Sequence, residues 1–210
     1  MLPGICIPGF KVVPPEADVT WNPSDKGADV VLSNGNLDAA STAASPWTGT
    51  GVRATVGRSA GKRYFEVYVV SNTSPDTSMH GLAKADWSLD NYLGTNGTSL
   101  GTRQVAEAYV SGGGVSHVGG AGFGGSDSAG VTIMWALDLD AGKVWHGRNG
   151  TWRNSGNPGA GTGNSFAIPA GPWFPGMAIY GASYGTYRLR TKLADFVYPP
   201  PSSFVSWATP

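Results

Sequence analysis

The feature that most restricts the fold is a run over residues 131–139 in which large apolar side chains occupy every second position. The apolar members of this face are Val131, Ile133, Trp135, Leu137 and Leu139. Strict alternation predicts a β-strand with one face on the core. Residues 140–142 then predict a turn, 143–148 a return strand, and Asn149-Gly150 a second hairpin into 151–153. The segment therefore predicts an antiparallel meander, with Thr132 and Asp138 on the face away from the core.

A second alternating strand is expected over residues 187–193. The inward positions are Tyr187, Leu189, Thr191 and Leu193, and the outward positions are Arg188, Arg190 and Lys192. The three cations form a solvated face or guard an edge strand, or else they form a binding stripe. Further strands are expected over 29–32, 52–56, 62–70, 79–83, 102–110 and 174–180. Turns about every 8–12 residues are typical of an antiparallel sandwich.

Composition excludes the main alternative folds. The 32 glycines and 15 prolines among 210 residues exclude a helical protein, because an interior helical position costs about 1 kcal/mol for Gly and about 3 kcal/mol for Pro. The 8 Trp, 8 Tyr and 7 Phe supply enough buriable surface to offset the entropy of ordering. A single all-β domain is the expected architecture at this length.

The first 18 residues differ from the rest. They contain four prolines, which disfavour helix and cannot donate to a central sheet. We expect an extended Pro-rich arm over residues 1–18, packed on its own sandwich or on a neighbour, and a sandwich domain over 19–210. The arm lacks the basic and apolar regions of a signal peptide, and no window of the chain approaches about 20 apolar residues. Synthesis in a cytoplasm and no membrane insertion are therefore expected.

The charge balance and the cysteine and histidine content argue against a nucleic-acid partner and a metal site. The 14 basic residues equal the 14 acidic residues, whereas a nucleic-acid binder normally has a basic excess. Cys6 is the only cysteine, and His80, His117 and His146 are far apart with no ligand spacing, so no metal site is expected. The glycine-rich segments 111–128 and 154–171 precede no predicted helix and cannot cradle a phosphate at a helix N-terminus. No cofactor is expected.

Catalytic patterns are also missing from the sequence. A glycosidase needs two carboxylates that flank the scissile bond. Asp138 and Asp140 are the nearest pair. Asp140 begins a turn, however, where Asp is favoured because its side chain accepts hydrogen bonds from nearby backbone amides. The three glutamates are Glu16, Glu66 and Glu107, widely separated. No Gly-x-Ser-x-Gly elbow or Ser/His/Asp arrangement is recognisable, so we expect no enzyme, with a sandwich-fold glycosidase as the least favoured alternative.

Several ordered segments resemble SPRY domains. Residues 61–67, Gly-Lys-Arg-Tyr-Phe-Glu-Val, resemble the family's Gly-x-x-Tyr-Phe-Glu-Val strand. Similar segments follow in the family's order at 81–94, 108–120, 130–150 with its Leu-Asp and Arg-Asn-Gly, 173–180 and 196–204. The usual Asn-Phe-Gly is absent, and residues 187–193 stand in its place.

The resemblance implies a single antiparallel, bent, concanavalin-like β-sandwich that is a non-catalytic interaction module. The segment 145–154 and the glycine-rich loop 156–163 are most similar to SPRY-type domains of tailed-bacteriophage virion proteins. We therefore expect a virion structural or adhesion protein: a fibre, spike or capsid-decoration subunit. Its expected partners are other virion proteins, further copies of itself, and a host-surface glycan or protein. The alternative is a free lectin-like or peptide-binding module.

A ligand site is expected at the loops of one sandwich end. The loop aromatics are Trp47, Trp87, Tyr92, Trp152, Trp173 and Tyr184, each of which could instead fill or cover the core. We predict a site formed by Trp87, Asp90, Tyr92, Trp152 and Arg153, and the family resemblance implies that their two loops lie at one end. Aromatic faces beside a carboxylate and a guanidinium suit a sugar or an extended peptide.

Overall fold

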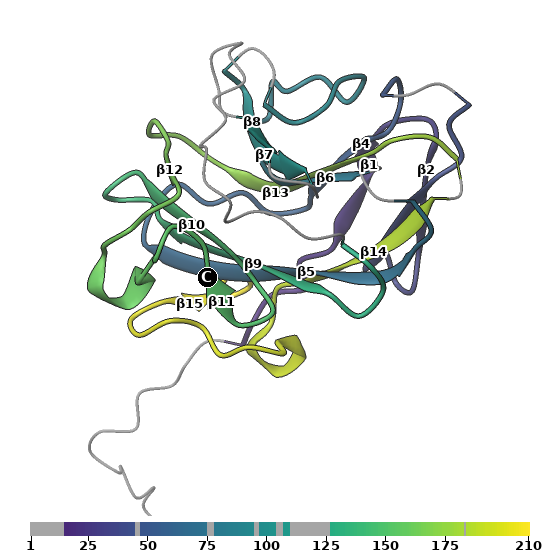
Figure 1. Cartoon of the computed structure of the whole chain (residues 1–210). Helices are drawn as coiled ribbons and strands as arrows, with labels where there is room; N and C mark the ends of the chain where they lie inside the picture. Colours follow the sequence, from purple (N-terminus) through teal and green to yellow (C-terminus); the bar gives the residue numbers. More distant parts are fainter. Residues whose placement is uncertain are drawn as a thin grey trace, which may run out of the picture.

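The computed structural model describes residues 15–44, 47–74, 78–94, 97–103, 107–109, 127–182 and 184–210. These residues form two facing β-sheets (Figure 1). In spatial order, the six-stranded sheet contains β1 (Trp21–Lys26), β4 (Gly51–Ala54), β13 (Phe174–Ile179), β6 (Ser78–Ala83), β7 (Ser99–Arg103) and β8 (Glu107–Tyr109). The predicted all-β sandwich is confirmed.

The second sheet has nine strands. Its path runs through β11 (Thr151–Trp152), β10 (Lys143–Arg148), β9 (Thr132–Asp138), β5 (Lys62–Asn72), β14 (Gly185–Arg190), β3 (Asp38–Ser41) and β2 (Val30–Ser33). Two short strands complete it, β12 (Phe166–Ala167) beside β10 and β15 (Val205–Ser206) beside β5. In the described part of the chain, the helices are two 3-10 turns, Pro158–Ala160 and Leu193–Asp195, and neither could span a membrane.

The predicted meander is confirmed, whereas some strand boundaries were wrong. Strand β10 pairs antiparallel with both β9 and β11, with Trp135 opposite His146. The single strand expected over 102–110 is two strands, β7 and β8, and β7 begins three residues earlier than expected, at Ser99. Strand β1, which contains Pro23, was not among the expected strands. It lies at a sheet edge, where a missing backbone donor is tolerated.

The main core lies between the two sheets. The inward side chains of β9 and β5 meet there, and the rings of Trp135 and Phe65 stack with centroids 6.2 Å apart. Trp207 reaches the same core from the C-terminal segment, 5.4 Å from Phe65 in an edge-on arrangement. The alternating pattern of residues 131–139 therefore identified the inner face correctly.

The outer face of the nine-stranded sheet is buried as well. Tyr64, Met134 and Trp145 form a second cluster there with Phe204 from the C-terminal segment. We name residues 193–204 the C-terminal strap, because they cover this face. Thr132 and Asp138 lie on this outer face, as expected, but they are only 2% and 8% exposed because the face is covered. Alternation reveals two faces but not that a distant segment covers the second.

The beginning of the described chain is attached to its end. The backbone N–H of Ala17 donates to the carbonyl of Ala208 at 3.0 Å. The Glu16 carboxylate accepts from the backbone N–H of Leu193 at 3.1 Å, and Lys192 pairs with Asp18. Residues 16–18 of the predicted arm therefore contact the sandwich, and residues 1–14 lie outside the described residues. Leu193 was expected to face the core, but it is 62% exposed.

Candidate functional site

The five residues of the predicted site lie on opposite sides of the sandwich. Trp87 and Tyr92 belong to a cluster on the outer face of the six-stranded sheet. Trp152 packs against the cluster on the outer face of the nine-stranded sheet, edge-on to Tyr64 at 6.3 Å. The two groups therefore do not form one surface. The binding role of each group stays a prediction.

The buried Trp87 side chain packs beneath its own loop, residues 84–94, between the loop and β4. It is 2% exposed, and its indole Nε1 donates to the carbonyl of Tyr92 at 3.3 Å. A Cβ on Gly51 would lie 2.7 Å from the Trp87 ring and 2.8 Å from Leu89. Glycine at this position of β4 therefore lets the loop lie directly on the strand, and Trp87 positions the loop.

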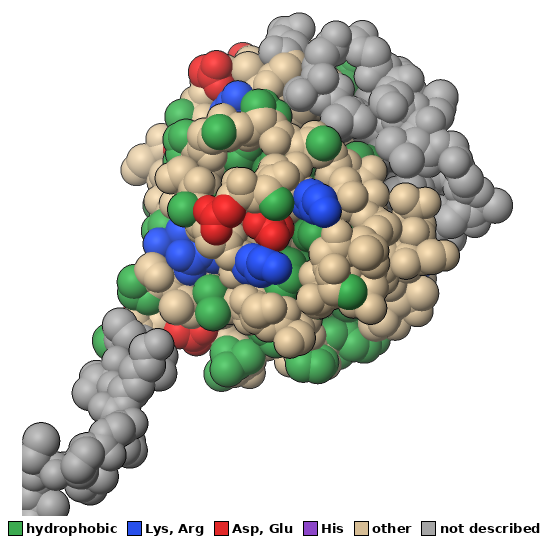
Figure 2. Space-filling model, turned by 90° about the vertical axis from the view of Figure 1, so that its left-hand side faces the viewer, with side chains coloured by type: hydrophobic (Ala, Val, Ile, Leu, Met, Phe, Trp, Pro, Cys, Tyr) green, Lys and Arg blue, Asp and Glu red, His purple; other side chains and the backbone are tan. Residues whose placement is uncertain are grey.

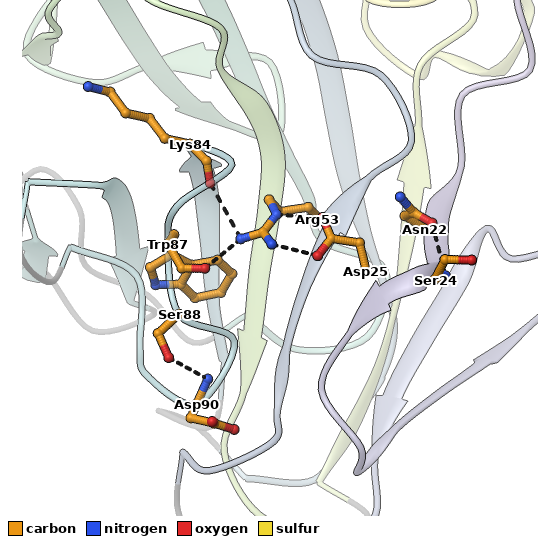
Figure 3. A network of polar contacts seen from close by, with 8 residues as sticks. All are labelled: Asn22, Ser24, Asp25, Arg53, Lys84, Trp87, Ser88 and Asp90. Atoms are coloured by element: carbon orange, nitrogen blue, oxygen red, sulfur yellow. Dashed lines mark hydrogen bonds and ion pairs between the residues drawn. The ribbon is translucent and has the colours of Figure 1, made fainter.

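Arg53 fastens the same loop to the sheet (Figure 3). From β4, its Nε and Nη2 donate to the two carboxylate oxygens of Asp25 at 2.7 and 2.5 Å. Its Nη1 donates to the carbonyl of Trp87 at 2.6 Å and to that of Lys84 at 3.4 Å. Because the guanidinium is buried and these bonds are charge-assisted, they hold the loop firmly.

Three half-buried aromatic side chains meet where this loop reaches the end of the sandwich. The Trp47 ring lies edge-on to Tyr180 at 5.1 Å and to Tyr92 at 6.0 Å. The exposed Asp90 accepts a hydrogen bond from the backbone N–H of Gly49 at 2.9 Å, which ties the two loops together. We name Trp47, Asp90, Tyr92 and Tyr180 the aromatic end surface.

The sequence identified part of this surface. Asp90 and Tyr92 were predicted site residues, and Trp47 was among the loop aromatics. Tyr180 was missed because it was assigned to the strand over 174–180, whereas β13 ends at Ile179. An aromatic residue directly after an alternating strand is the signal that could have found it.

Arg153 lies beside a different group. Its backbone N–H donates to the carbonyl of His146 at 2.9 Å. Burial and the nearby charge of Arg148 lower the pKa of Arg153. Arg153 therefore belongs with the polar side chains near β10 and not with the aromatic end surface.

Sequence reasoning also missed a polar seam between the sheets. His80 Nε2 lies 3.1 Å from a carboxylate oxygen of Asp127. The Thr102 hydroxyl oxygen lies 3.2 Å from His80 Nδ1 and 3.3 Å from His146 Nε2. The sequence shows no recognisable Ser/His/Asp arrangement, and the hydroxyl beside these two imidazoles belongs to a threonine. The seam was missed because its residues come from four separate segments.

Burial determines what the polar seam can do. Thr102 and His80 are each 1% exposed, so the hydroxyl is not presented as a nucleophile to a dissolved substrate. Burial is the main reason that the pKa of His146 is well below its ordinary value, and nearby His80, Arg153 and Arg148 lower it further. The seam is a buried polar connection between β6, β7 and β10.

Other candidates from the sequence are held in structural contacts. Arg188 donates two hydrogen bonds to Asp38 at 2.6 and 2.8 Å, and Arg190 lies over the Tyr68 ring at 4.2 Å. These contacts favour a paired surface over a free cationic stripe. Asp138 pairs with Lys62 at 3.4 Å, and Asp140 accepts from the backbone N–H of Gly61 at 3.0 Å.

Within the described ranges, no group of three His, Cys, Asp or Glu side chains is arranged to hold a metal ion. Cys6 and His117 lie outside those ranges, as does most of the glycine-rich segment 111–128.

The fold matches solved SPRY domains. The SPRY domain of human HERC1 has a TM-score of 0.61 and 16% identity over 81% of this chain and 96% of that chain. The PSpry domain of TRIM65 gives a TM-score of 0.55 and 16% identity over 81% and 90% of the two chains. A human SPRY domain gives a TM-score of 0.56 and 16% identity over 77% of this chain and 94% of that chain. No protein-family model and no curated protein sequence matches the chain. The chain therefore has the SPRY fold.

Proposed function

We propose that this chain is a non-enzymatic interaction module that binds a glycan or an extended peptide at the aromatic end surface. The observation that carries the proposal is the contact of Trp47 with both Tyr92 and Tyr180, beside the exposed Asp90. Aromatic rings offer apolar area on which a sugar ring or a peptide side chain can stack. The Asp90 carboxylate can accept further hydrogen bonds, since an ionised carboxylate has about four lone-pair sites.

The support beneath this surface favours binding. Arg53 and Trp87 hold the loop through its backbone carbonyls, so little additional ordering is needed when a ligand binds. A preorganised surface retains more of its interaction energy as affinity. The SPRY fold of the neighbours supports the class of function, because sandwich domains present binding loops at one end.

The proposed biological setting is a virion. The chain would be a fibre, spike or capsid-decoration subunit that displays the module in several copies, with other virion proteins as partners and a host-surface glycan or protein as ligand. The support is the similarity of segment 145–154 to tailed-phage SPRY-type domains and the apolar, Pro-rich start of the chain. Display in many copies can raise avidity about 10²–10⁴-fold over that of a single weak site.

Array binding tests the ligand site. The full chain, immobilised at high density, is applied to glycan and peptide arrays beside the Trp47→Ala, Tyr92→Ala and Trp152→Ala variants. We expect binding by the wild type and by Trp152→Ala, and at least a tenfold loss for the other two variants, once urea midpoints show that each is folded. Equal binding by all four proteins, or loss confined to Trp152→Ala, would place the site elsewhere.

Deletion of residues 1–14 tests the proposal that the chain is a virion subunit. A virion subunit anchored through this segment should keep ligand binding and lose assembly with particle proteins. Unchanged assembly would instead favour the free lectin-like or peptide-binding module.

A further inference from the structure

An exposed apolar patch lies beside the point where the described chain begins. Its members are Leu193, Val197 and Val205, which are 62%, 53% and 42% exposed. Glu16 connects this region to the chain start, because its carboxylate accepts from the backbone N–H of Leu193 and from the hydroxyl of Ser206. We name these three side chains the basal patch. Figure 2 shows hydrophobic side chains gathered along the lower edge of the molecule.

A hollow adjoins the basal patch. It has a volume of about 270 Å³ and is lined by Val19 and Leu37 together with Asp18, Lys192 and Asp195. Leu193 directly follows Lys192 and lies two residues before Asp195, so the chain passes from the lining of the hollow into the patch. This volume is below the roughly 300–1,000 Å³ of small-molecule pockets. It suits an inserted side chain better than a separate small ligand.

The N-terminal segment of the sequence has the chemistry that this surface needs. Residues 1–14 contain the apolar side chains Leu2, Ile5, Ile7, Phe10, Val12 and Val13. Lys11 is their only charged side chain. Asp18 at the hollow is paired with Lys192, whereas the exposed carboxylate of Asp195, which also lines the hollow, offers Lys11 a complementary charge.

Proline placement favours a neighbouring copy over self-docking. Val13 and Pro14 each precede a proline, and a residue before proline disfavours the helical region that a tight reversal requires. Proline also fixes its own φ. Because Leu193 already contacts Glu16, a segment that begins at residue 14 would have to reverse at once to cover the patch of its own chain.

We propose that the basal patch and its hollow receive residues 1–14 of a second copy of this chain. Two copies related by a twofold axis exchange these segments reciprocally, so each contact forms twice. The exchange buries the apolar side chains of both the segment and the patch. This inference concerns self-association and is independent of ligand binding at the aromatic end surface.

The oligomeric state of the full chain provides the first test. We expect light scattering to give at least twice the 21.7 kDa of one chain, and the chain without residues 1–14 to be monomeric. Leu193→Asp and Val197→Asp should each raise the dissociation constant at least about tenfold, which corresponds to about 1.4 kcal/mol. Val31→Asp is the matched control, because Val31 is 50% exposed on β2, and it should leave the constant unchanged.

Disulfide cross-linking tests whether residues 1–14 of a second copy lie on the basal patch. Two chains carrying Cys6→Ser, one with Val12→Cys and the other with Leu193→Cys, are mixed and oxidised. We expect a disulfide between the two chains, and a chain with both cysteines should form cross-linked oligomers at low concentration. A monomeric full chain, an association unaffected by Leu193→Asp, or a cross-linked monomer from the double variant would each overturn the proposal.

Discussion

Removal of the Glu66 carboxylate should release the C-terminal strap. Glu66 lies on the outer face of β5 and is fully buried. Its two oxygens accept from the backbone N–H groups of Val197 and Tyr198 at 3.0 and 2.9 Å and from the Tyr64 hydroxyl at 2.9 Å. Arg190 approaches the same carboxylate at 3.5 Å. One side chain therefore connects the strap to the sheet.

The expected magnitude follows from these contacts. In Glu66→Ala, the buried Tyr64 hydroxyl loses its acceptor at about 1–3 kcal/mol, the partly buried backbone N–H groups of Val197 and Tyr198 lose theirs at a smaller cost, and Arg190 loses a buried counter-charge. Detachment of the strap would rehydrate part of this network and limit the loss, so we expect about 3–5 kcal/mol, as for other broken buried pairs. Burial and Glu66 raise the pKa of Tyr64, so its hydroxyl remains a donor throughout the working pH range.

Urea unfolding and amide hydrogen exchange measure the effect. The exchange protection of Val197 and Tyr198 should fall before the rest of the domain unfolds, because their N–H groups are the donors. The control is Asp140→Ala, which removes an exposed carboxylate that accepts a single backbone bond from Gly61 and should cost under about 1 kcal/mol. A loss below about 1 kcal/mol in Glu66→Ala, or unchanged protection of both amides, would refute the reasoning.

Three further predictions concern the core, the seam and the loop. Trp135→Ala should cost about 3–5 kcal/mol in urea unfolding and Thr132→Ala far less; similar losses would mean that the two faces are wrongly assigned. The lowered pKa of His146 means that the unfolded chain binds a proton below about pH 6.5 that the folded chain does not. Stability is therefore complete above that pH and falls as pH falls, with a shallower slope expected for His146→Gln; equal slopes would contradict this assignment. Arg53→Lys should destabilise by about 2–3 kcal/mol, because lysine lacks the fork that bonds Asp25 and the Trp87 carbonyl together, and unchanged amide exchange in the 84–90 loop would argue against it.

Much of the fold was predictable because its signals are local. The inner face of β9 follows from alternation and the β9–β10–β11 meander from its two turns. The glycine and proline content agrees with helices of only one turn in the residues that the structure describes. Strand β1 was not predictable from its own residues, because only its position at a sheet edge makes Pro23 acceptable.

The candidate site was only partly predictable because it is assembled from distant segments. Asp90 and Tyr92 lie in one loop and could be identified together, but their neighbours Trp47 and Tyr180 come from two other loops. Trp152 looked equivalent to Trp87 in the sequence, yet strand order places the two on opposite outer faces. The order of the strands in a sheet cannot be inferred from residue type and local pattern.

Strand periodicity, the turns and the SPRY-like segments are all encoded locally, because each depends on residues a few positions apart. Three features became known from the folded chain alone: the outer face of β9 is buried, Glu66 holds the C-terminal strap, and a seam forms from Asp127, His80, Thr102 and His146. The physical reason is that a β-strand has two equivalent faces. Which of them is covered, and by what, depends on distant segments, as Val197 is more than a hundred residues from Glu66.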